Sequence, residues 1–218
     1  MIKGVIFDID GVLLDSLGIW DDLGARYLVS IGVEPEEGLN EILFSMSMEQ
    51  GAAYLNEHYR LQKTDTEILT GISKMIEAFY FDEVLPKSGA KELLEFMKAK
   101  GIRMTAATSS PRIHVEKALE RNGMLGFLER IFTNTEVGAS KHSPEIYEQA
   151  AAYMGTKPEE TLVFEDSLYA LKTADDAGFV TVGVYDIKGE TDREGVKNTG
   201  KYYVTELNEF PAVFETIK

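Results

Sequence analysis

The fold is organised around the stretch Gly4-Val5-Ile6-Phe7-Asp8-Ile9-Asp10-Gly11-Val12-Leu13-Leu14-Asp15-Ser16. Its apolar start, Val5 to Phe7, predicts a short buried strand. Asp8 and Asp10 follow that strand, and Gly11 then favours a turn. A buried carboxylate is costly unless a metal, a cation or several hydrogen bonds compensate its charge. The stretch is therefore either an ordinary acidic turn or a pair of functional carboxylates, and taken alone it leaves both interpretations open.

An EF-hand calcium loop is the obvious competing interpretation of this acidic turn. That loop follows a helix and needs glycine at its sixth position and glutamate at its twelfth. Counted from Asp8, Gly11 stands at the fourth position, Ile19 stands at the twelfth, and a predicted strand leads in. The spacing excludes an EF-hand.

The composition is that of an acidic protein with enough apolar residues for a core. The 218 residues include 22 Lys and Arg against 37 Asp and Glu, which gives a formal net charge of −15, and 44% of the residues are hydrophobic. A chain of this length forms one domain with an insert or two small domains. Its acidity argues against nucleic acid and anionic membrane as partners. An anionic substrate would need local positive charge from a metal or from a few lysines.

The chain has no cysteine, so disulfides and thiol catalysis are excluded. The first predicted strand begins directly after Met1-Ile2-Lys3, which leaves no room for a signal peptide. No apolar run approaches the roughly 18 residues of a transmembrane helix. We therefore expect a cytoplasmic protein, and we expect it to be a monomer.

The pattern after Ser16 is first helical and then strictly alternating. Helices are predicted over residues 17–31, 48–59 and 66–81, with no convincing strand between them, and a proline–glycine connector follows at residues 85–89. Beyond the connector, predicted strands over residues 104–108, 131–133, 162–164, 181–185 and 202–204 alternate with helices. Alternation predicts an α/β fold, a Rossmann-like parallel sheet with helices on both faces. We expect this core to comprise residues 1–16 and 86–218, with residues 17–85 inserted as an all-helical cap domain.

In such sheets, ligands bind outside the carboxyl ends of the strands. The predicted strand ends of this chain carry acids and hydroxyls, namely Asp8, Asp10, Thr108, Ser109, Ser110, Thr133, Asn134, Glu165 and Asp166. We expect these side chains to converge on one rim, where an oxygen-rich set suits a hard cation such as Mg²⁺.

Two further features of the rim suit an anion. Lys141 stands just before a predicted helix and is either a solvated lysine or the positive charge of the site. Thr108 and Ser109 form a hydroxyl-bearing turn before Pro111, which either caps the next helix or binds an anion at its N-terminus. Carboxylates, a cation, a lysine and hydroxyls together match phosphoryl transfer through a carboxylate nucleophile. The chain has no Gly-x-x-x-x-Gly-Lys loop, which argues against a P-loop nucleotidase.

The chain resembles the haloacid dehalogenase superfamily of phosphatases, in the subgroup that also contains beta-phosphoglucomutase, over essentially its whole length. Four stretches carry the resemblance in the family's order: Asp8-Ile9-Asp10-Gly11-Val12, Thr108 with the backbone of Ser109, Ser140-Lys141-His142-Ser143-Pro144, and Phe164-Glu165-Asp166-Ser167. One such motif is weak support, whereas four in order on the expected elements are specific.

The resemblance implies a role for each motif residue. It implies Asp8 as nucleophile and Asp10 as general acid and base, and the presence of Asp10 disfavours the dehalogenase branch. It implies Thr108, Ser109 and Lys141 as phosphate-binding residues. It also implies a Mg²⁺ site formed by Asp8, the Asp10 backbone carbonyl, and the acidic pair Glu165 and Asp166.

The cap is expected to select the substrate, because its closure excludes water and completes the site. Lys74 lies in a stretch that resembles the one whose lysine reaches a phosphate in beta-phosphoglucomutase. Trp20 stands where that enzyme has a histidine, and Met48 stands where it has an arginine that binds a second phosphate. Loss of that bidentate contact favours hydrolysis over phosphate transfer between sugar positions. For Trp20, Met46 and Met48, packing in a helical core is the commoner role of such side chains.

The expected function is Mg²⁺-dependent hydrolysis of a small phosphomonoester, such as a sugar phosphate or another small phosphorylated metabolite, through an aspartyl-phosphate. The alternatives are a phosphomutase of the beta-phosphoglucomutase type and, in another class, a catalytically idle domain that binds a phosphorylated ligand. His58, His114 and His142 show no spacing typical of a metal site, and we expect them at the surface.

Overall fold

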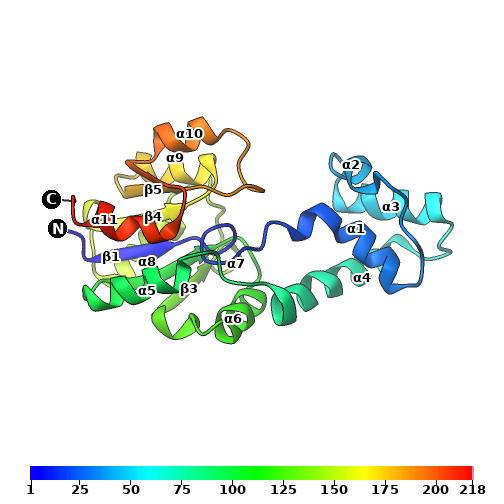
Figure 1. Cartoon of the computed structure of the whole chain (residues 1–218), viewed down its shortest axis with the longest axis horizontal. Coiled ribbons are helices and arrows are strands. Elements are labelled where there is room, and N and C mark those ends of the chain that lie inside the picture. The colour runs from blue at the N-terminus through cyan, green and yellow to red at the C-terminus, as the bar shows by residue number, and fades with distance from the viewer. Residues whose placement is uncertain (218) are drawn as a thin grey trace. The chain divides into compact units, whose positions relative to one another are not determined.

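The structure is a computed structural model that describes residues 1–217 (Figure 1). The chain divides into two compact units. One, the core unit, consists of Met1–Ser16 together with the chain from Val84 onward, and the other, the cap unit, is Leu17–Glu83. Among the described residues, no helix is both long and apolar enough to cross a membrane.

Within residues 1–217, the core unit contains a parallel sheet of six strands in the order β3-β2-β1-β4-β5-β6. The strands are β1 (Gly4–Phe7), β2 (Arg103–Thr108), β3 (Arg130–Thr133), β4 (Thr161–Glu165), β5 (Val180–Val184) and β6 (Tyr202–Val204). In the register of the sheet, Phe7 of β1 lies between Ala106 of β2 and Phe164 of β4. The predicted parallel sheet is confirmed, and β1 lies inside it, so its carboxyl end is flanked by those of β2 and β4.

Helices cover both faces of this sheet. They are α5 (Ala90–Ala99), α6 (Arg112–Arg121), α7 (Asn134–Val137), α8 (Glu145–Met154), α9 (Leu168–Asp176), α10 (Arg193–Thr199) and α11 (Phe210–Phe214), with 3₁₀ turns at Leu125–Phe127, Pro158–Glu160 and Leu207–Glu209. The short helices α7 and α10 lie where no helix is predicted from the sequence.

Successive residues of a strand point to opposite faces of a sheet, and the core is built on that alternation. Ile6 of β1 belongs to a buried apolar cluster with Ile146 and Tyr147 of α8. The next residue, Phe7, contacts Phe164 with ring centroids 4.9 Å apart, and Phe164 contacts Phe210 of α11 at 4.7 Å. Both faces of β1 are therefore buried, so polar side chains can be accommodated only beyond the end of the strand.

The cap unit is all-helical over residues 17–83, every one of which is described. It consists of α1 (Ile19–Ser30), α2 (Leu39–Leu43), α3 (Met48–Tyr59) and α4 (Asp65–Ala78), and α4 continues as a π-helical turn, Phe79–Glu83. Two capping boxes start the longer helices, Ser47 with Gln50 at α3 and Thr64 with Glu67 at α4. The inserted helical cap is confirmed. Helix α2 is not predicted from the sequence. The helix predicted over residues 66–81 is α-helical only as far as Ala78, and the π-helical turn follows it.

Candidate active site

The site begins with the loop that follows β1. Asp8 comes directly after the last residue of β1, and Gly11 adopts a φ of 78°, in the left-handed region that suits glycine. The Ile9 carbonyl then accepts hydrogen bonds from the amides of Leu13 and Leu14. The backbone is thus folded back on itself within a few residues, which holds the Asp-x-Asp segment at the end of β1.

Lys141 joins two buried carboxylates beside this loop. Its Nζ donates to Asp8 Oδ1 at 2.5 Å and to Glu165 Oε1 at 2.7 Å. Lys141 is 3% exposed and Glu165 is fully buried. Burial alone would lower the pKa of Lys141, but the carboxylates of Asp8 and Glu165 outweigh it and raise the pKa above its usual range. Lys141 is therefore a permanent positive charge in the cluster.

Asp166 brings a third carboxylate to this cluster. One carboxylate oxygen from each of Asp8, Glu165 and Asp166 lies within 4.8 Å of the others. Burial, followed by the negative charge of Glu165, raises the pKa of Asp8 well above its usual value and raises that of Asp166 to about 7. Lys141 supplies one positive charge against three acids, so the cluster is electrostatically under-compensated.

The donor set fits a divalent cation. Within residues 1–217, Glu165 Oε2 is buried and has no hydrogen-bond partner. Buried carboxylate oxygens without a partner are rare unless an ion or water binds them. Carboxylate oxygens around one point are also the ligands that Mg²⁺ prefers. The residues present thus suit Mg²⁺ at Asp8, Glu165 and Asp166.

Asp10 is held by hydroxyl donors. Ser16 Oγ donates to Asp10 Oδ1 at 2.6 Å, and Ser110 Oγ donates to Asp10 Oδ2 at 2.7 Å. Ser110 follows β2, so these bonds fix the Asp10 carboxylate between the loop after β1 and the end of the neighbouring strand. Among the described residues, Ser16 is a site contact that sequence reasoning missed, although it closes the opening stretch.

The predicted hydroxyl turn forms at the end of β2. Thr108 is fully buried, and its Oγ1 accepts a hydrogen bond from the Ser110 amide at 3.0 Å. Ser109 is exposed, and its hydroxyl accepts from Asn134 Nδ2 at 2.8 Å. The structure therefore brings Thr108 and Ser109 next to the residue that binds Asp10. The turn after β2 thus carries two hydroxyl groups, as a site that binds an oxyanion would require.

The sequence model of the haloacid dehalogenase-like hydrolases matches residues 2–178. The chain belongs to this family. It is 27% identical over 176 residues to the phosphorylated carbohydrates phosphatase of Thermotoga maritima, covering 81% of this chain and 82% of that protein.

Two solved structures share the fold. A beta-phosphoglucomutase-like protein of Thermotoga maritima superimposes with a TM-score of 0.87 at 24% identity, covering 100% of both chains. A haloacid dehalogenase family hydrolase of Deinococcus radiodurans, solved with bound phosphate and sodium, gives a TM-score of 0.74 at 22% identity and covers 98% of this chain and 95% of that one. The protein is a hydrolase of the haloacid dehalogenase family, and its curated relative named above is a phosphatase.

Two contacts of this haloacid dehalogenase site come from residues that carried no sequence signal. Tyr147 of α8 donates its hydroxyl to Glu165 Oε1 at 2.7 Å. In the sequence Tyr147 is one of several apolar positions of a helix. Burial, followed by the charge of Glu165, raises its pKa, so it stays a hydrogen-bond donor.

Lys87 is the second missed contact, because residues 85–89 looked like a plain connector. Lys87 Nζ donates to the Gly11 carbonyl at 2.5 Å, to the Tyr185 carbonyl at 2.6 Å and to Asp186 Oδ2 at 2.7 Å. It ties the loop after β1 to the segment after β5.

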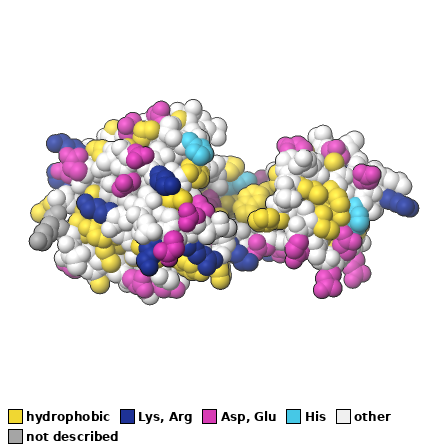
Figure 2. All heavy atoms as spheres, turned by 90° about the horizontal axis from the view of Figure 1, so that it is seen from above, with side chains coloured by type: hydrophobic (Ala, Val, Ile, Leu, Met, Phe, Trp, Pro, Cys, Tyr) yellow, Lys and Arg dark blue, Asp and Glu magenta, His cyan; other side chains and the backbone are white. Residues whose placement is uncertain are grey.

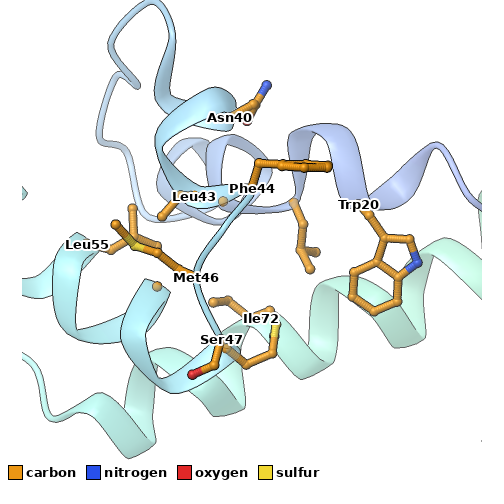
Figure 3. A pocket seen from close by; sticks show the side chains of 12 residues that line it. Trp20, Asn40, Leu43, Phe44, Met46, Ser47, Leu55 and Ile72 are labelled. Carbon is orange, nitrogen blue, oxygen red and sulfur yellow. The ribbon is translucent and has the colours of Figure 1, made fainter. Parts of the chain in front are cut away.

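The predicted cap residues fall into two groups. Trp20 is 56% exposed and Met48 is 40% exposed, so neither is a core residue. Figure 2 shows apolar side chains gathered on one face of the cap unit. Trp20 and Met48 line a pocket of that unit together with Met46 (Figure 3). Lys74 lies on α4 with an exposed side chain and does not line that pocket. Of the three histidines, His58 and His142 are exposed and His114 is half-buried.

Proposed function

We propose that this protein is a Mg²⁺-dependent phosphatase that hydrolyses small phosphomonoesters through an aspartyl-phosphate on Asp8. The observation that carries the proposal is the buried cluster in which Lys141 Nζ lies 2.5 Å from Asp8 Oδ1 beside Glu165 and Asp166. A nucleophile, a permanent cation and a carboxylate set suited to a metal thus occur at one point. The phosphatase of Thermotoga maritima that acts on phosphorylated carbohydrates supports the same class of substrate.

Asp8 attacks the phosphorus of the ester, and the bond to the leaving oxygen breaks as the aspartyl-phosphate forms. Lys141 neutralises charge on the transferred phosphoryl group, and Thr108 and the Ser109 backbone bind its remaining oxygens. Asp8, the Asp10 carbonyl, Glu165 and Asp166 would hold Mg²⁺, which supplies further positive charge beside the phosphoryl oxygens when bound.

Asp10 handles the protons in this scheme. It protonates the leaving oxygen in the first half of the reaction and deprotonates the attacking water in the second. Its two carboxylate oxygens are held by Ser16 and Ser110, so the group is oriented before substrate arrives. Water then hydrolyses the aspartyl-phosphate and returns Asp8 to its starting state.

The residues around Met48 in the cap unit support the assignment of hydrolysis rather than phosphate transfer by a mutase. A mutase has to hold a second phosphate, which calls for an arginine or lysine. Among the described residues, no charged side chain lines the pocket around Met48. Selection of the leaving group by the cap unit is part of this proposal, and so is the assignment of catalysis to the core unit.

The test is phosphate release from a broad panel of phosphomonoesters with Mg²⁺. We expect turnover by the wild-type protein and a loss of about 10³-fold or more in Asp8→Asn, since that variant lacks the nucleophile. The matched control is Asp15→Asn, an exposed aspartate of the same stretch, which should keep full activity.

Three other results would contradict the proposal. The first is that folded wild-type protein releases phosphate from no ester in the panel. The second is conversion of beta-glucose 1-phosphate to the 6-phosphate without phosphate release, which would identify a mutase. The third is equal binding of a phosphorylated ligand by wild type and Asp8→Asn without turnover, which would identify an idle domain.

A further inference from the structure

The acidic cluster of the core unit is reached by a side chain of α8, the hydroxyl of Tyr147. Val163 of β4 belongs to the buried apolar cluster that also contains Tyr147. Residues two apart in a strand point to the same face of a sheet, so Glu165, the last residue of β4, points to the face on which Tyr147 lies. Both residues are fully buried, and the Tyr147 hydroxyl donates to Glu165 Oε1 at 2.7 Å. This contact lies entirely within the core unit.

The packing around Tyr147 would be served equally well by phenylalanine. Its ring lies among apolar side chains, and its centroid is 6.0 Å from that of the Phe179 ring. A hydroxyl group in such surroundings is costly unless it has a hydrogen-bond partner. The structure gives it the carboxylate of Glu165 as partner. The hydroxyl is therefore explained by the acidic cluster and not by the packing of the core.

Tyr147 and Lys141 together occupy one oxygen of Glu165. Each oxygen of a carboxylate has lone pairs for a pair of contacts, either from hydrogen-bond donors or from a metal. Oε1 accepts from Lys141 Nζ and from Tyr147 Oη, both at 2.7 Å. Oε2 is buried and, within residues 1–217, has no hydrogen-bond partner. Oε1 is thus fully engaged with protein donors, whereas Oε2 keeps its lone pairs for a cation.

We propose that Tyr147 is a positioning residue that restricts Glu165 to a single metal-binding oxygen and thereby favours Mg²⁺ over Ca²⁺ at the cluster. The inference rests on the proposed function, in which Asp8, Glu165 and Asp166 hold Mg²⁺. Mg²⁺ requires octahedral geometry, whereas Ca²⁺ takes about six to eight oxygens and commonly binds both oxygens of one carboxylate. Glu165 can offer both of its oxygens to a metal only if Oε1 gives up a hydrogen bond.

The test is metal binding by the metal-free protein, measured as the rise in melting temperature with metal concentration, which needs no substrate. Wild type and Tyr147→Phe are each titrated with Mg²⁺ and with Ca²⁺. Hydrogen bonds to metal-binding carboxylates typically contribute about 10–100-fold to metal affinity. We expect the variant to raise the Kd for Mg²⁺ about tenfold, because Glu165 is less firmly oriented. The Kd for Ca²⁺ should change by about threefold or less, because Ca²⁺ gains access to Oε1.

The matched control is Tyr153→Phe, which removes the same hydroxyl group from α8 at a position that is 44% exposed. It should leave both Kd values unchanged. Without metal, Tyr147→Phe should remain folded, because it keeps the buried ring and leaves the hydrogen bond from Lys141 on Glu165 Oε1. Loss of one buried hydrogen bond should lower its melting temperature by about 2–4 °C.

A purely structural role for Tyr147 would lower the melting temperature and leave the ratio of the two Kd values unchanged, which would overturn the inference. An unfolded Tyr147→Phe, or equal weakening of both metals, would also overturn it. A lowered preference for Mg²⁺ in the variant, with no phosphate release from any ester by wild type, would refute the proposed function and support this inference. Phosphate release by wild type together with an unchanged ratio would refute this inference and leave the phosphatase intact.

Discussion

Replacing Lys87 by methionine is expected to loosen the loop that carries Asp8 and Asp10. Lys87 Nζ lies within 2.7 Å of three acceptors, the carbonyls of Gly11 and Tyr185 and the carboxylate of Asp186. Methionine is unbranched and only one heavy atom shorter than lysine, and it removes all three donors. The Gly11 carbonyl then loses the contact that connects it to the segment after β5.

The structure sets the size of the effect. The Lys87 side chain is 15% exposed and that of Asp186 is 4% exposed, so this is a largely buried ion pair. Removing one partner of a buried pair costs about 3–5 kcal/mol. Asp186 Oδ1 keeps its hydrogen bonds from the amides of Lys188 and Gly189, and water can reach a site that is 15% exposed. The lower limit, about 3 kcal/mol, is therefore expected, out of a total of about 5–15 kcal/mol for a protein domain.

The assay is chemical denaturation of three variants with phosphate release measured on the same samples. The variants are Lys87→Met, Asp186→Asn and the double variant. Asparagine keeps an oxygen for the two loop amides but removes the buried charge, so the double variant should be more stable than Lys87→Met. We also expect Lys87→Met to lower kcat by about tenfold to a hundredfold, because a displaced catalytic loop misaligns the nucleophile. A loss of stability below about 1 kcal/mol, or strictly additive losses in the double variant, would refute the reasoning.

Three further predictions concern the cluster and its loop. Burial and the charge of Glu165 raise the pKa of Asp166 from 3.8 to about 7, so the folded protein without metal loses stability as pH rises from about 4 to about 7. Mg²⁺ should therefore raise the melting temperature more at about pH 8 than at about pH 5. Asp166→Asn should reduce that difference, while Asp8, whose pKa is also raised, keeps part of it. Lys141→Met leaves two buried carboxylates unpaired, and denaturation should show a loss of about 3–5 kcal/mol together with loss of phosphate release; unchanged stability would contradict the buried pairing. Gly11→Ala places a side chain at a φ of 78°, and we expect it to cost about 1–2 kcal/mol in the same assay, whereas a neutral effect would mean that the turn adopts another backbone conformation.

Local signals explain which elements were predictable. The helix predicted over residues 48–59 is α3, Met48–Tyr59, because the capping box of Ser47 and Gln50 that starts it is encoded within a few residues. The short helices α2, α7 and α10 were not predicted. Helices of four to seven residues are not stable by propensity alone and form through the contacts of the folded chain.

The sequence by itself determined the kind of chemistry at the rim. The alternation of strands and helices implies a parallel sheet, and a parallel sheet gathers the residues that follow its strands, among them Asp8, Asp10 and Asp166. That inference needs the pattern of elements and the residue types that follow them, and both are local properties of the sequence.

Only the tertiary structure decided which charged side chains pair and which apolar side chains the cap unit exposes. Lys141 meets Asp8 across 133 positions of sequence, and Lys87 meets Asp186 across 99. Such pairs depend on the order β3-β2-β1-β4-β5-β6, which local propensity does not encode. The exposure of Trp20 and Met48 around an uncharged pocket likewise depends on how four helices pack, because an apolar residue on a helix can lie in a core or at a binding surface with the same sequence pattern.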